Sequence, residues 1–77
     1  MKLIEYENRG DYNFYFKFDN SESGEVNIAT LIKKYVAKDE LSTAKIDKEW
    51  GCLEFKNSMV DIEPKTLYKF FKNKTYI

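Results

Sequence analysis

The clearest pattern in the chain is a run from residue 12 to residue 18 in which every second side chain is a large aromatic one. The aromatic positions are Tyr12, Phe14, Phe16 and Phe18, and the positions between them hold Asn13, Tyr15 and Lys17. Because successive side chains of a strand point to opposite faces, this alternation predicts a strand with one buried and one wetter face.

Shorter alternating runs precede and follow this strand. Residues 2–7 predict a strand with Ile4 and Tyr6 on one side and Leu3 on the other, and residues 25–28 resume the alternation after a polar loop. Three consecutive strands joined by short polar turns favour an antiparallel meander.

The apolar period then changes from that of a strand to that of a helix. Between residues 29 and 37, the apolar side chains recur at helical spacing, at Leu31, Ile32, Tyr35 and Val36. A stripe of this kind is typical of a short amphipathic helix that packs on a sheet.

The second half of the chain repeats this order of strands followed by a helix. Residues 43–49 and 52–56 predict a hairpin around Trp50-Gly51, and residues 59–62 predict a further short strand or extended segment. Pro64 fits the first position of a closing helix, where its missing N–H group costs little.

These elements predict an α+β fold: a small antiparallel sheet of about five strands, with the helices at 29–37 and 64–72 packed on one face. The strands fall into two antiparallel groups, and whether the groups join into one sheet stays open. At 77 residues the chain is short for a fold held by a hydrophobic core alone. We therefore expect a single domain, residues 1–77, in which every apolar face matters.

Composition narrows the choice of function without defining it. Apolar residues make up 43% of the chain and aromatic residues 17%, which indicates a packed core rather than disorder. Thirteen Lys and Arg residues balance thirteen Asp and Glu residues, so no strong net field attracts nucleic acid or an anionic membrane. The chain has one cysteine and no apolar run of membrane-spanning length, which favours a cytoplasmic protein.

Residues that commonly carry catalysis or bind metals are scarce. The chain has no histidine, so the commonest metal ligand and the commonest neutral-pH base are missing. Glu54 and Asp61 are candidates for paired carboxylates, but the sequence does not fix their separation. Cys52 has only Lys56 as a basic neighbour on its strand face, so we expect a buried thiol rather than a nucleophile. We predict no enzyme, no metal site and no cofactor.

Three aromatic residues are candidates for binding a protein partner: Tyr12, Tyr15 and Trp50. Exposed Tyr and Trp side chains anchor many protein interfaces. The alternative is that a domain of this size needs every aromatic residue for its core. An open sheet edge would offer a second docking surface, through strand addition.

The closing helix also has a basic face, formed by Lys65, Lys69, Lys72 and Lys74. Positive charge late in a helix complements the helix dipole, so solvated lysines explain the pattern without a ligand. The alternative is contact with phosphate groups, which predicts salt-sensitive binding of nucleic acid.

The segments Phe16-Lys17-Phe18, Gly24–Ile28, Ala44–Asp47 and Asp61–Tyr68, read in this order, resemble the bacterial domain of unknown function family 2442. Its most specific motif, D-I-x-P-x-x-L-Y, is matched at Asp61, Ile62, Pro64, Leu67 and Tyr68. The chain departs from the family at residues 55–58, where Phe-Lys-Asn-Ser stands in place of W-P-N-G.

We interpret this motif as mainly structural. Asp61 is expected to cap the closing helix, and Tyr68 to pack its ring and bond a backbone group through its hydroxyl.

The resemblance implies a small protein that works with the product of a neighbouring small gene, in a toxin–antitoxin-like pair. We therefore predict a non-enzymatic protein-binding module that is antitoxin-like. One alternative is an inhibitor, encoded by a phage or mobile element, that binds a host defence protein. Another is a nucleic-acid-associated regulator that uses the lysine-rich helix. No membrane partner is expected, and homodimerisation stays open.

Overall fold

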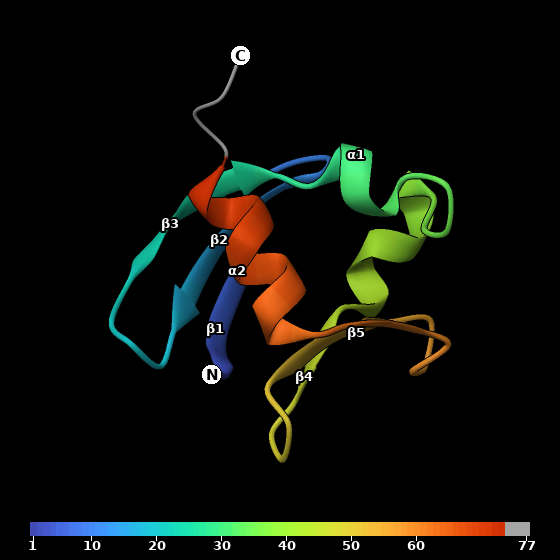
Figure 1. The fold of residues 1–77 in the computed structure, drawn as a ribbon. Helices are drawn as coiled ribbons and strands as arrows, with labels where there is room; N and C mark the ends of the chain where they lie inside the picture. Colours follow the sequence, from blue (N-terminus) through green and yellow to red (C-terminus); the bar gives the residue numbers. More distant parts are fainter. Residues whose placement is uncertain (74–77) are drawn as a thin grey trace.

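A computed structural model of the chain describes residues 1–73. These residues form two three-stranded antiparallel sheets, each next to short helical segments (Figure 1). The first sheet contains β1 (Leu3–Asn8), β2 (Asn13–Phe18) and β3 (Ser23–Asn27). The second sheet contains β4 (Lys45–Asp47), β5 (Cys52–Phe55) and β6 (Val60–Ile62). The helical segments are α1 (Ala29–Ile32), the 3-10 helix η1 (Lys38–Thr43) and α2 (Pro64–Lys72). The predicted α+β class is confirmed, with six strands in two sheets.

The aromatic alternation of β2 forms the floor of the core. Phe14, Phe16 and Phe18 are fully buried, and the rings of Phe14 and Phe16 stack with centroids 5.7 Å apart. Tyr15 and Lys17, between them, are only half-buried. The predicted meander is confirmed, since β2 pairs with β1 on one side and with β3 on the other.

The predicted sidedness of the first strand is wrong, because β1 contains an irregularity. Leu3 pairs with Phe18 and Glu5 with Lys17, so Ile4 is an extra residue in the register. A bulge of this kind shifts the alternation by one position. As a result Leu3 is buried, Tyr6 packs against the core from the same strand, and Ile4 is exposed.

The helix predicted for residues 29–37 is shorter than expected. It covers Ala29–Ile32, and in the turn that follows the Ile32 carbonyl accepts hydrogen bonds from the N–H groups of both Tyr35 and Val36. This turn buries Val36 completely while leaving Tyr35 exposed. The Val36 carbonyl accepts a hydrogen bond from the Tyr12 hydroxyl, so at this residue the chain is bonded to Tyr12, next to β2, and does not continue a regular helix.

The two sheets are joined by their side chains and by the β4–β5 turn. The rings of Phe14 and Phe55 form a T-shaped pair, with centroids 6.1 Å apart and an interplanar angle of 86°. The Tyr6 hydroxyl donates to the carbonyl of Ala44, and the Leu3 N–H group donates to the carbonyl of Gly51. The predicted hairpin around Trp50-Gly51 is confirmed, although β4 is shorter than residues 43–49 because η1 extends to Thr43.

Helix α2 closes the core by crossing the first sheet (Figure 1). Pro64 occupies its first turn, as predicted, and Leu67 and Phe71 are buried. The Phe71 and Tyr68 rings both contact Phe18, at centroid distances of 5.4 and 5.2 Å. Within residues 1–73, every helix is too short or too polar to cross a membrane.

Candidate binding groove

The three aromatic residues predicted to bind a partner lie in different environments. Trp50 is 66% exposed on the β4–β5 turn, and Tyr15 lies half-buried on the outer face of the first sheet, with the Arg9 guanidinium 5.1 Å from its ring centre. The expectation that the sheet leaves Tyr12 unburied is wrong. Tyr12 is only 6% exposed, because its ring joins the core and its hydroxyl donates to the carbonyl of Val36.

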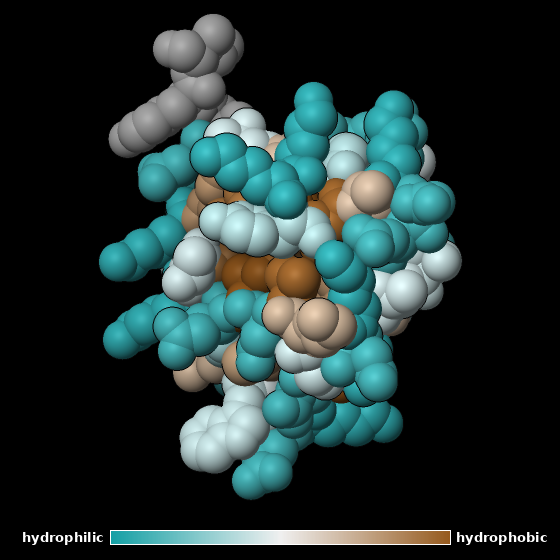
Figure 2. Space-filling view, turned by 90° about the vertical axis from the view of Figure 1, so that its right-hand side faces the viewer, coloured by the Kyte–Doolittle hydropathy of each residue, from teal (hydrophilic) through white to brown (hydrophobic). Residues whose placement is uncertain are grey.

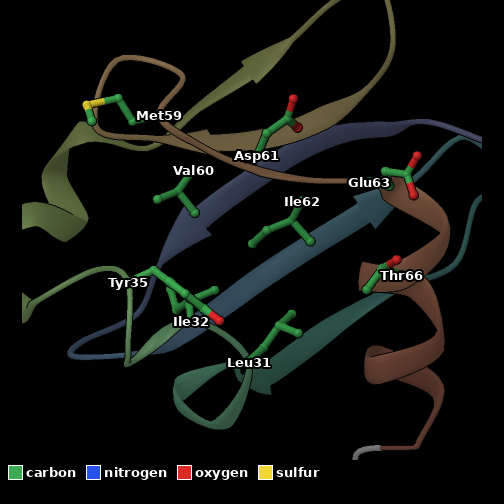
Figure 3. A pocket seen from close by; sticks show the side chains of 9 residues that line it. All are labelled: Leu31, Ile32, Tyr35, Met59, Val60, Asp61, Ile62, Glu63 and Thr66. Atoms are coloured by element: carbon green, nitrogen blue, oxygen red, sulfur yellow. The ribbon is translucent and has the colours of Figure 1, made fainter.

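A groove of about 380 Å³ lies between α1 and β6, and none of these three residues lines it. One wall comes from α1 and the turn after it, and the other from β6 and its flanking residues. The lining residues are Leu31, Ile32, Tyr35, Met59, Val60, Asp61, Ile62, Glu63 and Thr66 (Figure 3). Figure 2 shows hydrophobic side chains in a hollow on this side of the molecule, framed by hydrophilic ones.

Two large apolar side chains stand at the rim of this groove. Met59 is 81% exposed and Tyr35 is 61% exposed. Neither was singled out from the sequence. Tyr35 has the spacing of a buried helical position, and Met59 follows a turn with no distinctive pattern. The signal that marks the site is the alternation Val60-Asp61-Ile62-Glu63, which is typical of a strand with one apolar face.

Asp61 does not cap α2, so this prediction is wrong. Glu63 occupies the N-cap position of the helix, and its side chain makes no capping hydrogen bond. Asp61 belongs to β6, where pairing with β5 places it opposite Glu54. The extension of β6 to Ile62 therefore places the Asp61 carboxylate outside the first helical turn.

The face of the second sheet turned away from the core carries several acids. Glu54 is only 6% exposed; it accepts a hydrogen bond from the Ser58 hydroxyl at 2.9 Å and lies 3.8 Å from the Lys45 ammonium. Asp47 is the cross-strand partner of Cys52. The candidate paired carboxylates, Glu54 and Asp61, are thus cross-strand neighbours on this face, where Glu54 is buried and Asp61 is exposed. Within residues 1–73, these acids form no cluster able to hold a metal ion.

Cys52 lies among these acids and is buried, as expected. Burial raises the pKa of its thiol to about 11, helped by a hydrogen bond to the Asp61 carboxylate and by the negative charges of Asp61, Asp47 and Glu54. A thiol with a raised pKa carries little thiolate at neutral pH and is a poor nucleophile.

We therefore expect Cys52 to react slowly with iodoacetamide in the folded protein. Raising the pKa from 9.0 to about 11 lowers the thiolate fraction about 100-fold near neutral pH. Mass spectrometry of alkylation against time measures the rate, and the same protein in urea supplies the unshielded reference. Equal rates in buffer and in urea would contradict this environment.

The basic face of α2 is partly neutralised by Glu22, in the loop between β2 and β3. Lys65, Lys69 and Lys72 are exposed, but the Lys72 ammonium donates to Glu22 at 2.8 Å. The Tyr68 hydroxyl donates to the other oxygen of that carboxylate at 2.5 Å, so its predicted backbone partner is wrong. Lys74 lies outside the described residues.

The hydrogen bonds of the Glu22 carboxylate should make the stability of the protein depend on pH. Hydrogen bonds from Lys72 and Tyr68 hold the pKa of Glu22 below its usual 4.5. A lowered folded-state pKa means that this contribution is present above pH 4.5 and is lost as pH falls through the folded-state value. We expect the Tm of Glu22→Gln to fall less on acidification than that of the wild type. Glu49→Gln, an exposed control, should follow the wild type, and parallel curves for all three proteins would refute the coupling.

Fold and groove together define a small α+β domain with an apolar cleft beside a strand edge. The chain belongs to the family described as "Protein of unknown function (DUF2442)", whose profile matches residues 3–73. This match confirms the resemblance seen in the sequence. Comparisons with curated proteins and with solved structures found no match.

Proposed function

We propose that the protein is a cytoplasmic, non-enzymatic protein-binding module that acts as an antitoxin-like partner of a neighbouring small protein. The observation that supports this proposal is the apolar groove between α1 and β6, with Tyr35 and Met59 exposed at its rim. Met and Tyr are enriched at protein interfaces relative to the rest of the surface.

Because Tyr35 and Met59 are exposed, they contribute little burial free energy to the stability of this small domain. Burying a Met or Leu side chain fully stabilises a protein by about 1.5–3 kcal/mol, and a chain of this length has few such residues to spare. A partner that covers Met59 and Tyr35 would recover this free energy as affinity. An antitoxin-like protein that is always made beside its partner fits such a surface.

The other two functions have less support. A regulator that binds nucleic acid would use α2, but the Lys72 ammonium already pairs with Glu22, which leaves Lys65 and Lys69 among the described lysines of that face. An inhibitor of a host defence protein would use the same groove, so it differs from the leading proposal in its partner rather than in its surface.

Co-expression with the product of the adjacent gene tests the proposal. We expect a complex on size-exclusion chromatography, and calorimetry should show that Tyr35→Ala combined with Met59→Ala weakens binding at least about tenfold, equivalent to roughly 1.4 kcal/mol. Ile4→Ala removes an apolar side chain that is also exposed, but on the first sheet, and should leave the affinity unchanged. The proposal would be overturned if no complex forms, or if the variant Tyr35→Ala/Met59→Ala binds the partner as tightly as the wild type does.

A further inference from the structure

β6 is an edge strand of the second sheet, and its residues line the groove. The strand order of the second sheet is β4-β5-β6, so among the strands of residues 1–73 β6 pairs with β5 alone. Alternate N–H and C=O groups of such a strand point away from its neighbour and are free to pair with another chain. Five consecutive residues, from Met59 to Glu63, line the groove.

The side chains of β6 alternate between two chemically different faces. Val60 and Ile62 point into the groove toward α1, whereas Asp61 points to the opposite side (Figure 3). A chain that paired with β6 would share this alternation, because side chains opposite each other in a sheet lie on the same face. Its residues would meet apolar side chains at one position and a carboxylate at the next.

We propose that the partner supplies an extended segment that adds to β6 as a further strand of the second sheet. Apolar residues at alternate positions of this segment enter the groove, and a Lys or Arg residue between them lies beside Asp61. The inference rests on the proposed function and names the kind of partner segment that the same site accepts.

Charge complementarity selects the basic residue. Neither Asp61 nor Glu63 forms a salt bridge with another described residue. Asp61 faces Glu54 across the sheet, and Asp47 is near as well, whereas the cation paired on this face is Lys45. Like charges opposite each other destabilise a sheet, so a cation on the new strand would relieve this repulsion.

A docked helix fits these features less well. A helix could place apolar side chains in the groove, but it satisfies its backbone hydrogen bonds internally and would leave the edge of β6 unpaired. It also places neighbouring contacts three or four residues apart, whereas β6 alternates every second residue.

A phage-displayed library of random peptides of about twelve residues, long enough to form a strand, tests the inference. The library is selected on the wild type and counter-selected on the variant Tyr35→Ala/Met59→Ala. We expect enriched peptides in which apolar and basic residues alternate. Methylating the backbone nitrogens of the best peptide one at a time should weaken binding about tenfold or more at every second position, where a strand hydrogen bond is lost.

Charge reversal provides matched protein variants. Asp61→Lys should weaken binding of the selected peptide at least tenfold, and Asp19→Lys, an exposed acid in the β2–β3 turn, should not change it. No enrichment over the counter-selected variant, a helical methylation pattern or indifference to Asp61→Lys would each overturn the strand-addition inference. The proposed function is decided separately, because the adjacent gene product would still bind through the groove if its segment were helical.

Discussion

Replacing Phe55 by alanine is expected to lower the free energy of unfolding by about 3–5 kcal/mol, the usual cost of removing a fully buried Phe side chain. Phe55 is fully buried in β5 and meets Phe14 of the first sheet edge to face. The substitution therefore opens a cavity at the contact that joins the two sheets. Because small domains have stabilities near the low end of about 5–15 kcal/mol, most of the margin would be lost.

Urea denaturation followed by circular dichroism measures this change. Met59→Ala is the matched control, because it also truncates a large apolar side chain but one that is 81% exposed, and it should stay within about 0.5 kcal/mol of the wild type. A loss below about 1 kcal/mol for Phe55→Ala would mean that the sheets do not share a core at this point.

Replacing Gly51 by alanine is the second change with a large expected effect, about 2–4 kcal/mol. Gly51 has a φ of +73°, which disfavours any side chain. A Cβ atom there would lie 2.4 Å from the Cβ and 2.6 Å from the Cα of Lys2, so the backbone before β1 would have to move. That movement would break the hydrogen bond from the Leu3 N–H group to the Gly51 carbonyl.

Gly10→Ala separates the two causes. Gly10 also has a positive φ, +110°, but a Cβ atom there would have nothing within 4 Å. It should therefore cost only the conformational part, about 1–2 kcal/mol. Equal losses for the two variants in thermal and urea denaturation would show that the close approach of the β4–β5 turn to Lys2 is unimportant.

Strong local sequence patterns predicted much of the fold correctly. The aromatic alternation from Phe14 to Phe18 predicted β2 and its buried face correctly. All the large aromatic side chains of this segment except Tyr15 lie on one face of the strand, and burying that face against the core is strongly favourable. Pro64 marked the start of α2, since proline is tolerated in a first helical turn. These signals depend on neighbouring residues alone, and long-range contacts did not change them.

Other features depend on contacts that are distant in sequence. The bulge at Ile4 depends on how β1 pairs with β2, and a local pattern does not contain this information. The burial of Tyr12, in contrast, follows the alternation that it shares with Phe14, so the expectation of an exposed Tyr12 departed from the local pattern. The turn between β5 and β6 has positive φ at three consecutive residues, Lys56, Asn57 and Ser58. None of them is glycine, the residue that usually signals such a turn.

The groove between α1 and β6 is not evident from the sequence for a related reason. Tyr35 has the spacing of a buried residue, but α1 ends at Ile32, and in the turn after it Val36 is buried while Tyr35 is exposed. The open edge of β6 depends on the order of the strands in the second sheet, which sequence periodicity does not specify. Of the two alternatives for Trp50, exposure and burial in the core, the structure shows exposure, and its part in binding stays a prediction.

Hydrogen exchange of the complex with the adjacent gene product tests the groove most directly. Backbone amides that become paired or covered on binding exchange more slowly. We predict added protection at residues 59–63 and at Tyr35, with little change at Ile4 on the first sheet. Protection confined to the lysine-bearing face of α2, or to the turn that carries Trp50, would contradict binding through the groove.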